Sequence, residues 1–321
     1  MEVGFPKTIQ DEATRKTAGD ACFSKISSAE LGYFTDGYSK FFTKNKRKMM
    51  PLINRGTWTR VFSVRTLVNN FLSKFPTDKI QIVSLGAGFD CNFFYYQENV
   101  LEFNERDLHY FEVDFEDITA QKIDIIKQHS ELEELIFKDA EPSYEEGMIQ
   151  TERYTLLSCD IRQVDDLEDK LVQVGLDKTI PTLVLTECVL CYMNSEDSSQ
   201  IIAKIAEMFA DVAIVNFEMI NPNDPFGTTM VENLEARGCQ LLGLKDVPDE
   251  SAQVARMVDN GFQNGYCENM LRIHNSKLDE TERSRIERIE MFDEFEEWDL
   301  LQSHYCICVG SKFSDSSELG F

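Results

Sequence analysis

The sequence has few basic residues and no long apolar run, and both shortages limit what the protein can do. Its 32 Lys and Arg stand against 57 Asp and Glu, a formal net charge of -25. Such a charge repels nucleic-acid backbones, so we expect no nucleic-acid partner. No apolar stretch approaches the roughly 20 residues of a membrane helix, and the N-terminus lacks the apolar segment of a secretory signal. We therefore expect a soluble protein of the cytoplasm, with the nucleus as a second compartment, and no membrane partner.

Proline and histidine are also scarce, with 8 and 4 residues among 321, whereas hydrophobic residues make up 42% of the chain. A globular chain of this length buries roughly three quarters of its unfolded surface, so a substantial core is expected. The nine cysteines are an odd number in a chain without an export signal, which favours reduced thiols. Two close cysteine spacings occur, Cys188 with Cys191 and Cys306 with Cys308. Neither is accompanied by a second metal-like cluster or by a histidine at ligand spacing, so we predict no metal site.

Short β-branched runs alternate with helical patterns along most of the chain. This alternation is typical of βαβ units and predicts a mostly parallel sheet covered on both faces. After a polar segment at 1–20, which we expect to be mobile, residues 21–321 are predicted to form one domain. The acidic run at 131–146 is interpreted as a surface insertion. The predicted strands lie at 80–85, 109–114, 153–158, 182–186, 212–217, 261–268 and 304–309.

A glycine turn and three acids mark the ends of the first four strands. Gly86-Ala87-Gly88 follows the first strand, and Asp114, Asp160 and Glu187 come at the ends of the next three. Since ligands of open α/β sheets bind at the carboxyl ends of the strands, these acids should meet at one site. Cys91 stands where a dinucleotide fingerprint has its third glycine, which weakens a nicotinamide hypothesis. The set favours a nucleoside ligand that carries positive charge, and S-adenosylmethionine is such a ligand.

The chain also contains a set of longer sequence blocks: Ile53-Asn54-Arg55-Gly56, Arg60-Val61, Leu85-Gly86-Ala87-Gly88, Phe111-Glu112-Val113-Asp114-Phe115, Pro181-Thr182-Leu183, Glu187-Cys188-Val189-Leu190, Tyr192-Met193, Phe226-Gly227, Glu232-Asn233-Leu234 and His304-Tyr305-Cys306. In these blocks the sequence resembles the leucine carboxyl methyltransferases, which esterify the C-terminal leucine of type 2A protein phosphatase catalytic subunits. The resemblance covers nearly the whole chain. It implies an α/β class I methyltransferase fold, Rossmann-like, with a seven-stranded sheet and added helices at about 21–75 and 222–300 that form a substrate lid. It further implies S-adenosylmethionine as methyl donor, the phosphatase catalytic subunit as partner and a monomeric enzyme.

The same resemblance implies a role for each matching site residue. Two cations would hold the carboxylate end of the methyl donor, and a glycine would let its methionyl part pass close to the turn. Acids would bind its ribose, adenine and amine, and an arginine and a tyrosine would face the peptide carboxylate. The two cations are Lys25 and Arg60, and the glycine is Gly86. The acids are Asp114 for the ribose, Asp160 together with Ile161 for the adenine, and Glu187 for the amine. The residues that would face the peptide carboxylate are Arg60 and Tyr192.

Methyl transfer to a carboxylate sets few demands on catalytic side chains. A free α-carboxyl group has a pKa of about 3.3–3.7, so the nucleophile is already ionised at neutral pH and needs no general base. We therefore expect alignment and exclusion of water rather than a catalytic histidine. Three alternatives stay open: a nicotinamide-dependent oxidoreductase, an acidic scaffold that binds phosphatase without modifying it, and a relative that methylates a tRNA base precursor, which the net charge of -25 disfavours.

Overall fold

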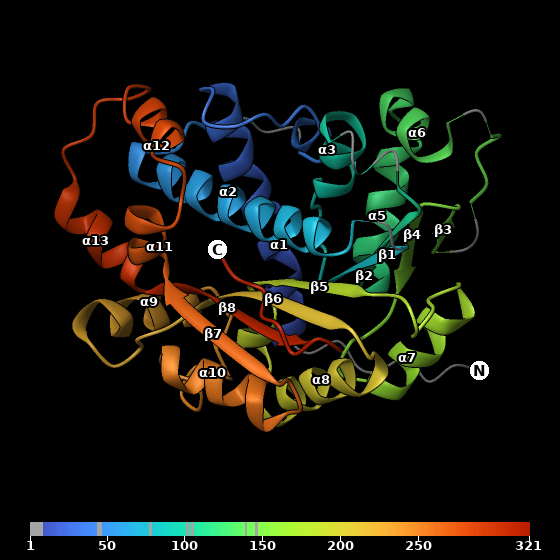
Figure 1. The fold of residues 1–321 in the computed structure, drawn as a ribbon. Helices are drawn as coiled ribbons and strands as arrows, with labels where there is room; N and C mark the ends of the chain where they lie inside the picture. The colour runs from blue at the N-terminus through green and yellow to red at the C-terminus, as the bar shows by residue number, and fades with distance from the viewer. Residues whose placement is uncertain are drawn as a thin grey trace.

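An eight-stranded sheet forms the centre of the molecule (Figure 1). The computed structural model describes residues 9–43, 47–76, 79–100, 103, 106–138, 140–144 and 147–321. The strand order is β3-β4-β2-β1-β5-β6-β8-β7. The pairs among β4, β2, β1, β5 and β6 are parallel, whereas β3, β7 and β8 pair antiparallel with their neighbours.

The seven strands predicted from the sequence are all present, with shifts of a few residues at their ends. They are β1 (Ile80–Leu85), β2 (Leu108–Asp114), β4 (Tyr154–Ser158), β5 (Thr182–Glu187), β6 (Val212–Met219), β7 (Asn264–Asn269) and β8 (Tyr305–Lys312). An eighth strand, β3 (Ile149–Gln150), has only two residues and pairs with the edge of β4. So short a strand carries no periodicity, and the prediction of seven strands missed it for that reason.

Helices cover both faces of the sheet (Figure 1). Alternate residues of β1 pack in opposite directions: Ile82 belongs to the core under α2, and Val83 belongs to the core over α8. Burial on both faces explains why the strands are continuous apolar runs. One face carries α2 (Pro51–Lys74), α3 (Asn92–Asn99), α5 (Glu116–Ile126), α6 (Ser130–Phe137), α11 (Met270–Ser276) and α12 (Glu280–Ile286), and the other carries α7 (Val164–Gln173), α8 (Ser195–Met208) and α10 (Glu250–Asp259).

Four of the remaining elements lie around the carboxyl ends of the strands: α1 (Ile9–Glu30), the 3-10 helix η2 (Leu190–Tyr192), α9 (Pro225–Glu235) and α13 (Phe295–Ser303). A second 3-10 helix, η1 (Ser39–Phe41), is flanked by Tyr38 and Phe42 of the core under α2. Helix α9 begins with Pro225, and the Asp224 side chain caps it by accepting a hydrogen bond from the Gly227 N–H at 2.7 Å. No helix within the described residues is both long and apolar enough to span a membrane.

Two segments differ from the sequence-based expectation. Residues 9–20 of the segment 1–20, which is expected to be mobile, form the first half of α1, and residues 1–8 of that segment lie outside the described residues. The residues of α1 show no clear apolar face. The acidic run at 131–146, interpreted as a surface insertion, begins within α6. Leu132, Ile136 and Phe137 of that helix are buried in the core, so the acids stand on the outer face of an amphipathic helix.

Candidate active site

A cavity of about 620 Å³ opens at the carboxyl ends of the parallel strands. Its lining includes two walls, and α1 and α2 also contribute residues to it, among them Lys25 and Arg60. The strand-end wall comes from the segments that follow β1, β2, β4 and β5, and includes Gly86, Asp114, Asp160 and Glu187. The helical wall comes from α9 and α13, and includes Phe226, Met230, Leu234, Leu301 and Gln302. All eight residues named by the sequence analysis line this one cavity: Lys25, Arg60, Gly86, Asp114, Asp160, Ile161, Glu187 and Tyr192.

The glycine turn after β1 brings the main chain to the cavity surface. Gly86 has a φ of 66°, a conformation that favours glycine, and a Cβ there would lie 2.6 Å from Val189 Cγ2. The N–H groups of Gly86 and Ala87 donate to the Val113 carbonyl at 2.8 and 3.2 Å. The turn is therefore fixed to β2, and only glycine fits at its first position.

Asp114 lies at the end of β2, directly beside this turn. Its Oδ2 accepts the Gly88 N–H at 2.6 Å, and its Oδ1 accepts the Phe115 N–H at 2.7 Å. Burial raises the pKa of Asp114 above the ordinary value, although the two main-chain N–H groups act in the opposite direction. Each carboxylate oxygen has a second lone pair, so the group can accept further hydrogen bonds from a ligand diol.

Four charged side chains form a balanced cluster in the cavity. Arg60 Nε donates to Glu187 Oε2 at 2.6 Å, and Lys25 Nζ donates to Asp90 Oδ1 at 2.5 Å. The Arg60 guanidinium also lies 4.6 Å from the ring centroid of Phe217. Burial would lower the pKa of both cations, but the carboxylates outweigh burial and raise both pKa values. Two cations beside two anions suit a zwitterionic ligand.

The segment after β5 places Tyr192 in the same wall. Cys188 has a φ of 56°, a conformation that is rare for a residue with a side chain, and its N–H donates to the Phe217 carbonyl at 2.7 Å. Glu218 then accepts the N–H groups of Leu190 and Cys191 at 3.1 and 3.3 Å, which holds the first turn of η2. Burial raises the pKa of Tyr192 well above its ordinary value, so its hydroxyl is neutral and can donate a hydrogen bond.

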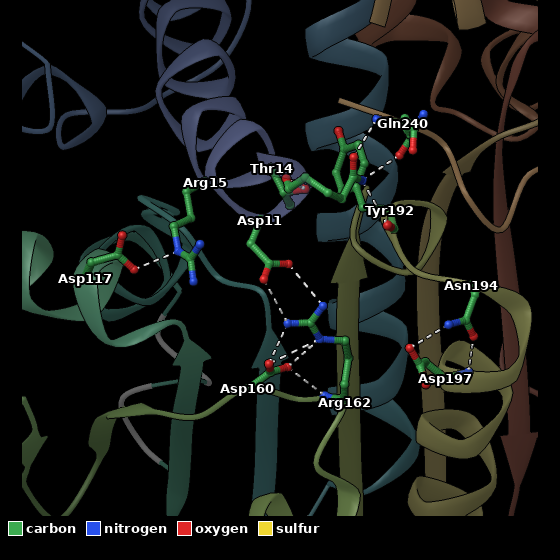
Figure 2. Close-up of polar contacts among 11 residues, drawn as sticks. Asp11, Thr14, Arg15, Asp117, Asp160, Arg162, Tyr192, Asn194, Asp197 and Gln240 are labelled. Atoms are coloured by element: carbon green, nitrogen blue, oxygen red, sulfur yellow. Dashed lines mark hydrogen bonds and ion pairs between the residues drawn. The ribbon is translucent and has the colours of Figure 1, made fainter. Parts of the chain in front are cut away.

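Asp160 lies in the wall, but its carboxylate already has a cationic partner (Figure 2). Arg162 donates to it through Nε at 2.9 Å and through Nη2 at 2.6 Å. The same guanidinium reaches Asp11 of α1 at 3.0 Å. The resemblance implied that Asp160 and the main chain of Ile161 flank the adenine, and the structure adds a link from this acid through Arg162 to α1. Ile161, the neighbouring residue, is buried in the wall.

Several residues of the site carried no signal of their own in the sequence. On α1, Gln10 Nε2 donates to the Tyr192 carbonyl at 3.1 Å. Arg15 Nε, also on α1, donates to Asp117 Oδ1 at 2.8 Å (Figure 2). Arg162 stands two positions after Asp160, a spacing that could have suggested a pair. Asp11 lies 151 positions before Arg162, so no local pattern could have joined them.

Comparisons with known proteins agree with this geometry. A family profile described as leucine carboxyl methyltransferase matches residues 6–206. The leucine carboxyl methyltransferase 1 homolog of Arabidopsis thaliana is 37% identical over 295 residues, which cover 92% of this chain and 88% of that protein. Leucine carboxyl methyltransferase 1 of Rattus norvegicus is 34% identical, covering 97% and 93%. A solved structure from Thermobifida fusca, assigned as a methyltransferase, matches the fold with a TM-score of 0.53 at 11% identity, covering 92% of this chain and 94% of that one.

The fold and these relatives define the class as the methyltransferases with a Rossmann-like sheet. Within that class, the chain belongs to the leucine carboxyl methyltransferase family.

Proposed function

We propose that this enzyme transfers a methyl group from S-adenosylmethionine to the α-carboxylate of the C-terminal leucine of a type 2A protein phosphatase catalytic subunit. The observation that carries the proposal is the position of Arg60. It lies in one cavity with the strand-end wall, which suits a charged nucleoside, and with the apolar side chains of α9, which suit a leucine. The names of the relatives support leucine carboxyl methylation, and the resemblance stated above supports the phosphatase.

The residues present fit the methyl donor. Asp114 would accept the two ribose hydroxyls, and the Gly86 turn leaves room for the methionyl part beside the main chain. The balanced cluster would hold the amino-acid end, with Lys25 and Arg60 toward its carboxylate and Glu187 toward its ammonium. Asp160 would act at the adenine end together with Arg162 and the main chain of Ile161.

The bound donor supplies an electrophilic methyl group on a sulfonium sulfur. The protein's part is to orient the carboxylate nucleophile and to keep water away. The Arg60 guanidinium can hold a carboxylate through two parallel hydrogen bonds, because Glu187 occupies only its Nε. The buried Tyr192 hydroxyl can donate a further bond to the same group. Among the described residues that line the cavity none is a histidine, and an ionised carboxylate needs no base.

Water exclusion matters because the reaction joins opposite charges into neutral products. Water stabilises the separated charges and so opposes the reaction, whereas an apolar enclosure does not. Phe226, Met230 and Leu234 of α9 provide an apolar cover on the helical wall. Arg60 also compensates locally for a net charge of -25, which repels an anionic peptide end at long range.

The experiment that tests the proposal is a labelled-methyl transfer assay on phosphatase catalytic subunit. We expect label on the protein that ends in leucine and none on the same protein without that residue, and we expect the label to be released by mild base as an ester is. Equal labelling of both proteins, or no labelling of either, would contradict the proposed substrate. Binding of the phosphatase without transfer would favour the scaffold hypothesis.

A further inference from the structure

A buried charge pair lies beneath the glycine turn, outside the cavity. Lys122 of α5 and Glu112 of β2 are both 0% exposed, and Lys122 Nζ lies 2.5 Å from Glu112 Oε2. Tyr154 of β4 donates its hydroxyl to the same Glu112 oxygen at 2.7 Å. A charge pair this deep loses its hydration, and apolar residues of similar volume often replace such pairs without loss of stability. Because stability does not explain this pair and it lies beside a ligand site, we infer that it has a role in ligand binding.

Lys122 has a second hydrogen bond, and this one leads toward the cavity. Its Nζ donates to the main-chain carbonyl of Asp90 at 2.7 Å. Asp90 closes the glycine turn, because its N–H donates to the Ala87 carbonyl at 2.9 Å. The turn is thus held from two sides, by Asp114 at the Gly88 N–H and by Lys122 at the Asp90 carbonyl.

The side chain of Asp90 links the glycine turn to Lys25. Its Oδ2 accepts the Asn92 N–H at 3.1 Å, and its Oδ1 accepts Lys25 Nζ at 2.5 Å. Lys25 comes from α1, 65 positions away, and its side chain is 11% exposed. The Asp90 carboxylate is the hydrogen-bonded anion that fixes the Lys25 ammonium in the cavity wall.

We propose that Lys122 is a positioning residue: through the Asp90 carbonyl it fixes the Asp90 carboxylate, and through that carboxylate it sets the Lys25 ammonium to receive the carboxylate of the methyl donor's amino-acid end. Lys122 does not itself line the cavity. Burial would lower its pKa, but the Glu112 carboxylate outweighs burial and raises it, so the group donates as an ammonium. The inference rests on the proposed function and adds a residue to it.

The test uses two ligands that differ only at the end that Lys25 would bind. S-adenosylhomocysteine carries the amino-acid end, whereas 5′-methylthioadenosine lacks it. Calorimetry on the full chain measures both affinities, and their ratio is the affinity for S-adenosylhomocysteine divided by the affinity for 5′-methylthioadenosine. Lys122→Met combined with Glu112→Gln removes both charges and keeps the acceptor for Tyr154. We expect this double variant to lose at least about tenfold in affinity for S-adenosylhomocysteine and little for 5′-methylthioadenosine, so that the ratio falls.

Tyr154→Phe is the matched control, because it removes a hydrogen bond from the same buried network without touching Asp90. Its ratio should equal that of the wild type even if its melting temperature falls. An unchanged ratio in the double variant, an equal weakening of both ligands, or the same fall in Tyr154→Phe would each overturn the positioning role.

A second variant covers the case in which the double variant does not fold. Asp90→Asn keeps the acceptor for the Asn92 N–H and removes the charge that holds Lys25. A lower ratio there supports the relay, and an unchanged ratio overturns it. If the wild-type chain bound neither ligand, the proposed function would fail, and this inference with it. If it bound both and the variants kept its ratio, only the positioning role would fail.

Discussion

The strand-end wall and the helical wall of the cavity are built in different ways. On the strand-end wall, each functional residue either ends a strand or follows one within a few residues, and main-chain hydrogen bonds fix the segments around it, as at Gly86 and Cys188. On the helical wall, Gly227 is the only buried residue of α9. The side chains of α9 that line the cavity are partly exposed, and the helix is tied to the body through Asp224, which His304 contacts at 2.9 Å.

This difference suggests a division of labour. A wall fixed by buried main chain is preorganised, which suits a ligand with many polar groups. A helix with little buried surface can move at low cost, which suits the entry and release of a protein tail. Arg60 of α2 stands where the two walls meet. The predictions below test whether the walls act separately, from the largest expected effect to the smallest.

Arg60→Ala should have the largest effect, because it removes a group that serves both walls and leaves Glu187 without its partner. We expect kcat/KM for the protein substrate to fall by more than about tenfold, the scale of one charge-assisted hydrogen bond of about 1.5–3 kcal/mol. Arg60→Lys is the control, because it keeps the charge but not the forked geometry. Its kcat/KM for the protein substrate should lie between the values of the wild type and of Arg60→Ala. Unchanged kinetics in a folded Arg60→Ala enzyme would remove Arg60 from the site.

Asp114→Ala should affect the strand-end wall alone. We expect the dissociation constant for S-adenosylhomocysteine to rise by about tenfold, because the ribose loses its charged acceptor. At saturating donor, the KM for the protein substrate should change little. Asp114→Asn keeps an acceptor for the turn and separates loss of charge from loss of the turn's support. Calorimetry that shows normal affinity in a folded Asp114→Ala variant would contradict the ribose role.

Met230→Ala should affect the helical wall alone, and less strongly. Truncation of one partly exposed apolar side chain costs about 1 kcal/mol, which is roughly fivefold in KM for the protein substrate. Affinity for S-adenosylhomocysteine should stay at the wild-type value. Glu235→Ala, on the same helix but outside the cavity lining, is the control and should leave both quantities unchanged. A loss of donor affinity in Met230→Ala would show that the two walls are coupled.

The pH dependence should be the smallest effect near neutrality. The raised pKa values of Lys25 and Arg60 keep both cations charged, so the rate should be flat from about pH 6.5 to 8.5. On the acid side, burial raises the pKa of Asp114, so this carboxylate takes up its proton at a higher pH than an exposed one. As pH falls, the affinity for the donor should therefore decline at a pH where exposed carboxylates are still ionised. Asp114→Asn should remove that decline. A steep limb near pH 6.5 in kcat would indicate a titrating histidine instead.

The sequence analysis predicted the strand-end wall from local patterns, whereas it predicted helices at about 222–300, where α9 and α13 lie, only through the family resemblance. Strands such as β1 and β5 are buried on both faces and are therefore recognisable as short apolar runs. The glycine turn and the acids lie at the ends of these recognisable strands, so their positions could be predicted as well. Arg60 and Tyr192 were assigned through the family resemblance, and the structure brings them into the cavity with the acids. The partnership of Asp160 with Arg162, and its link to Asp11 in the first half of α1, were not predicted.

By itself, the sequence determined the alternation of strands and helices, the glycine turn and the acids at the strand ends, because each of these depends on residues a few positions apart. The tertiary structure decided the rest. Asp11 reaches Arg162 across 151 positions, and Lys25 reaches Asp90 across 65. These pairs form only after packing has excluded water and brought distant segments together. A local pattern of residues therefore does not predict which distant residues will pair.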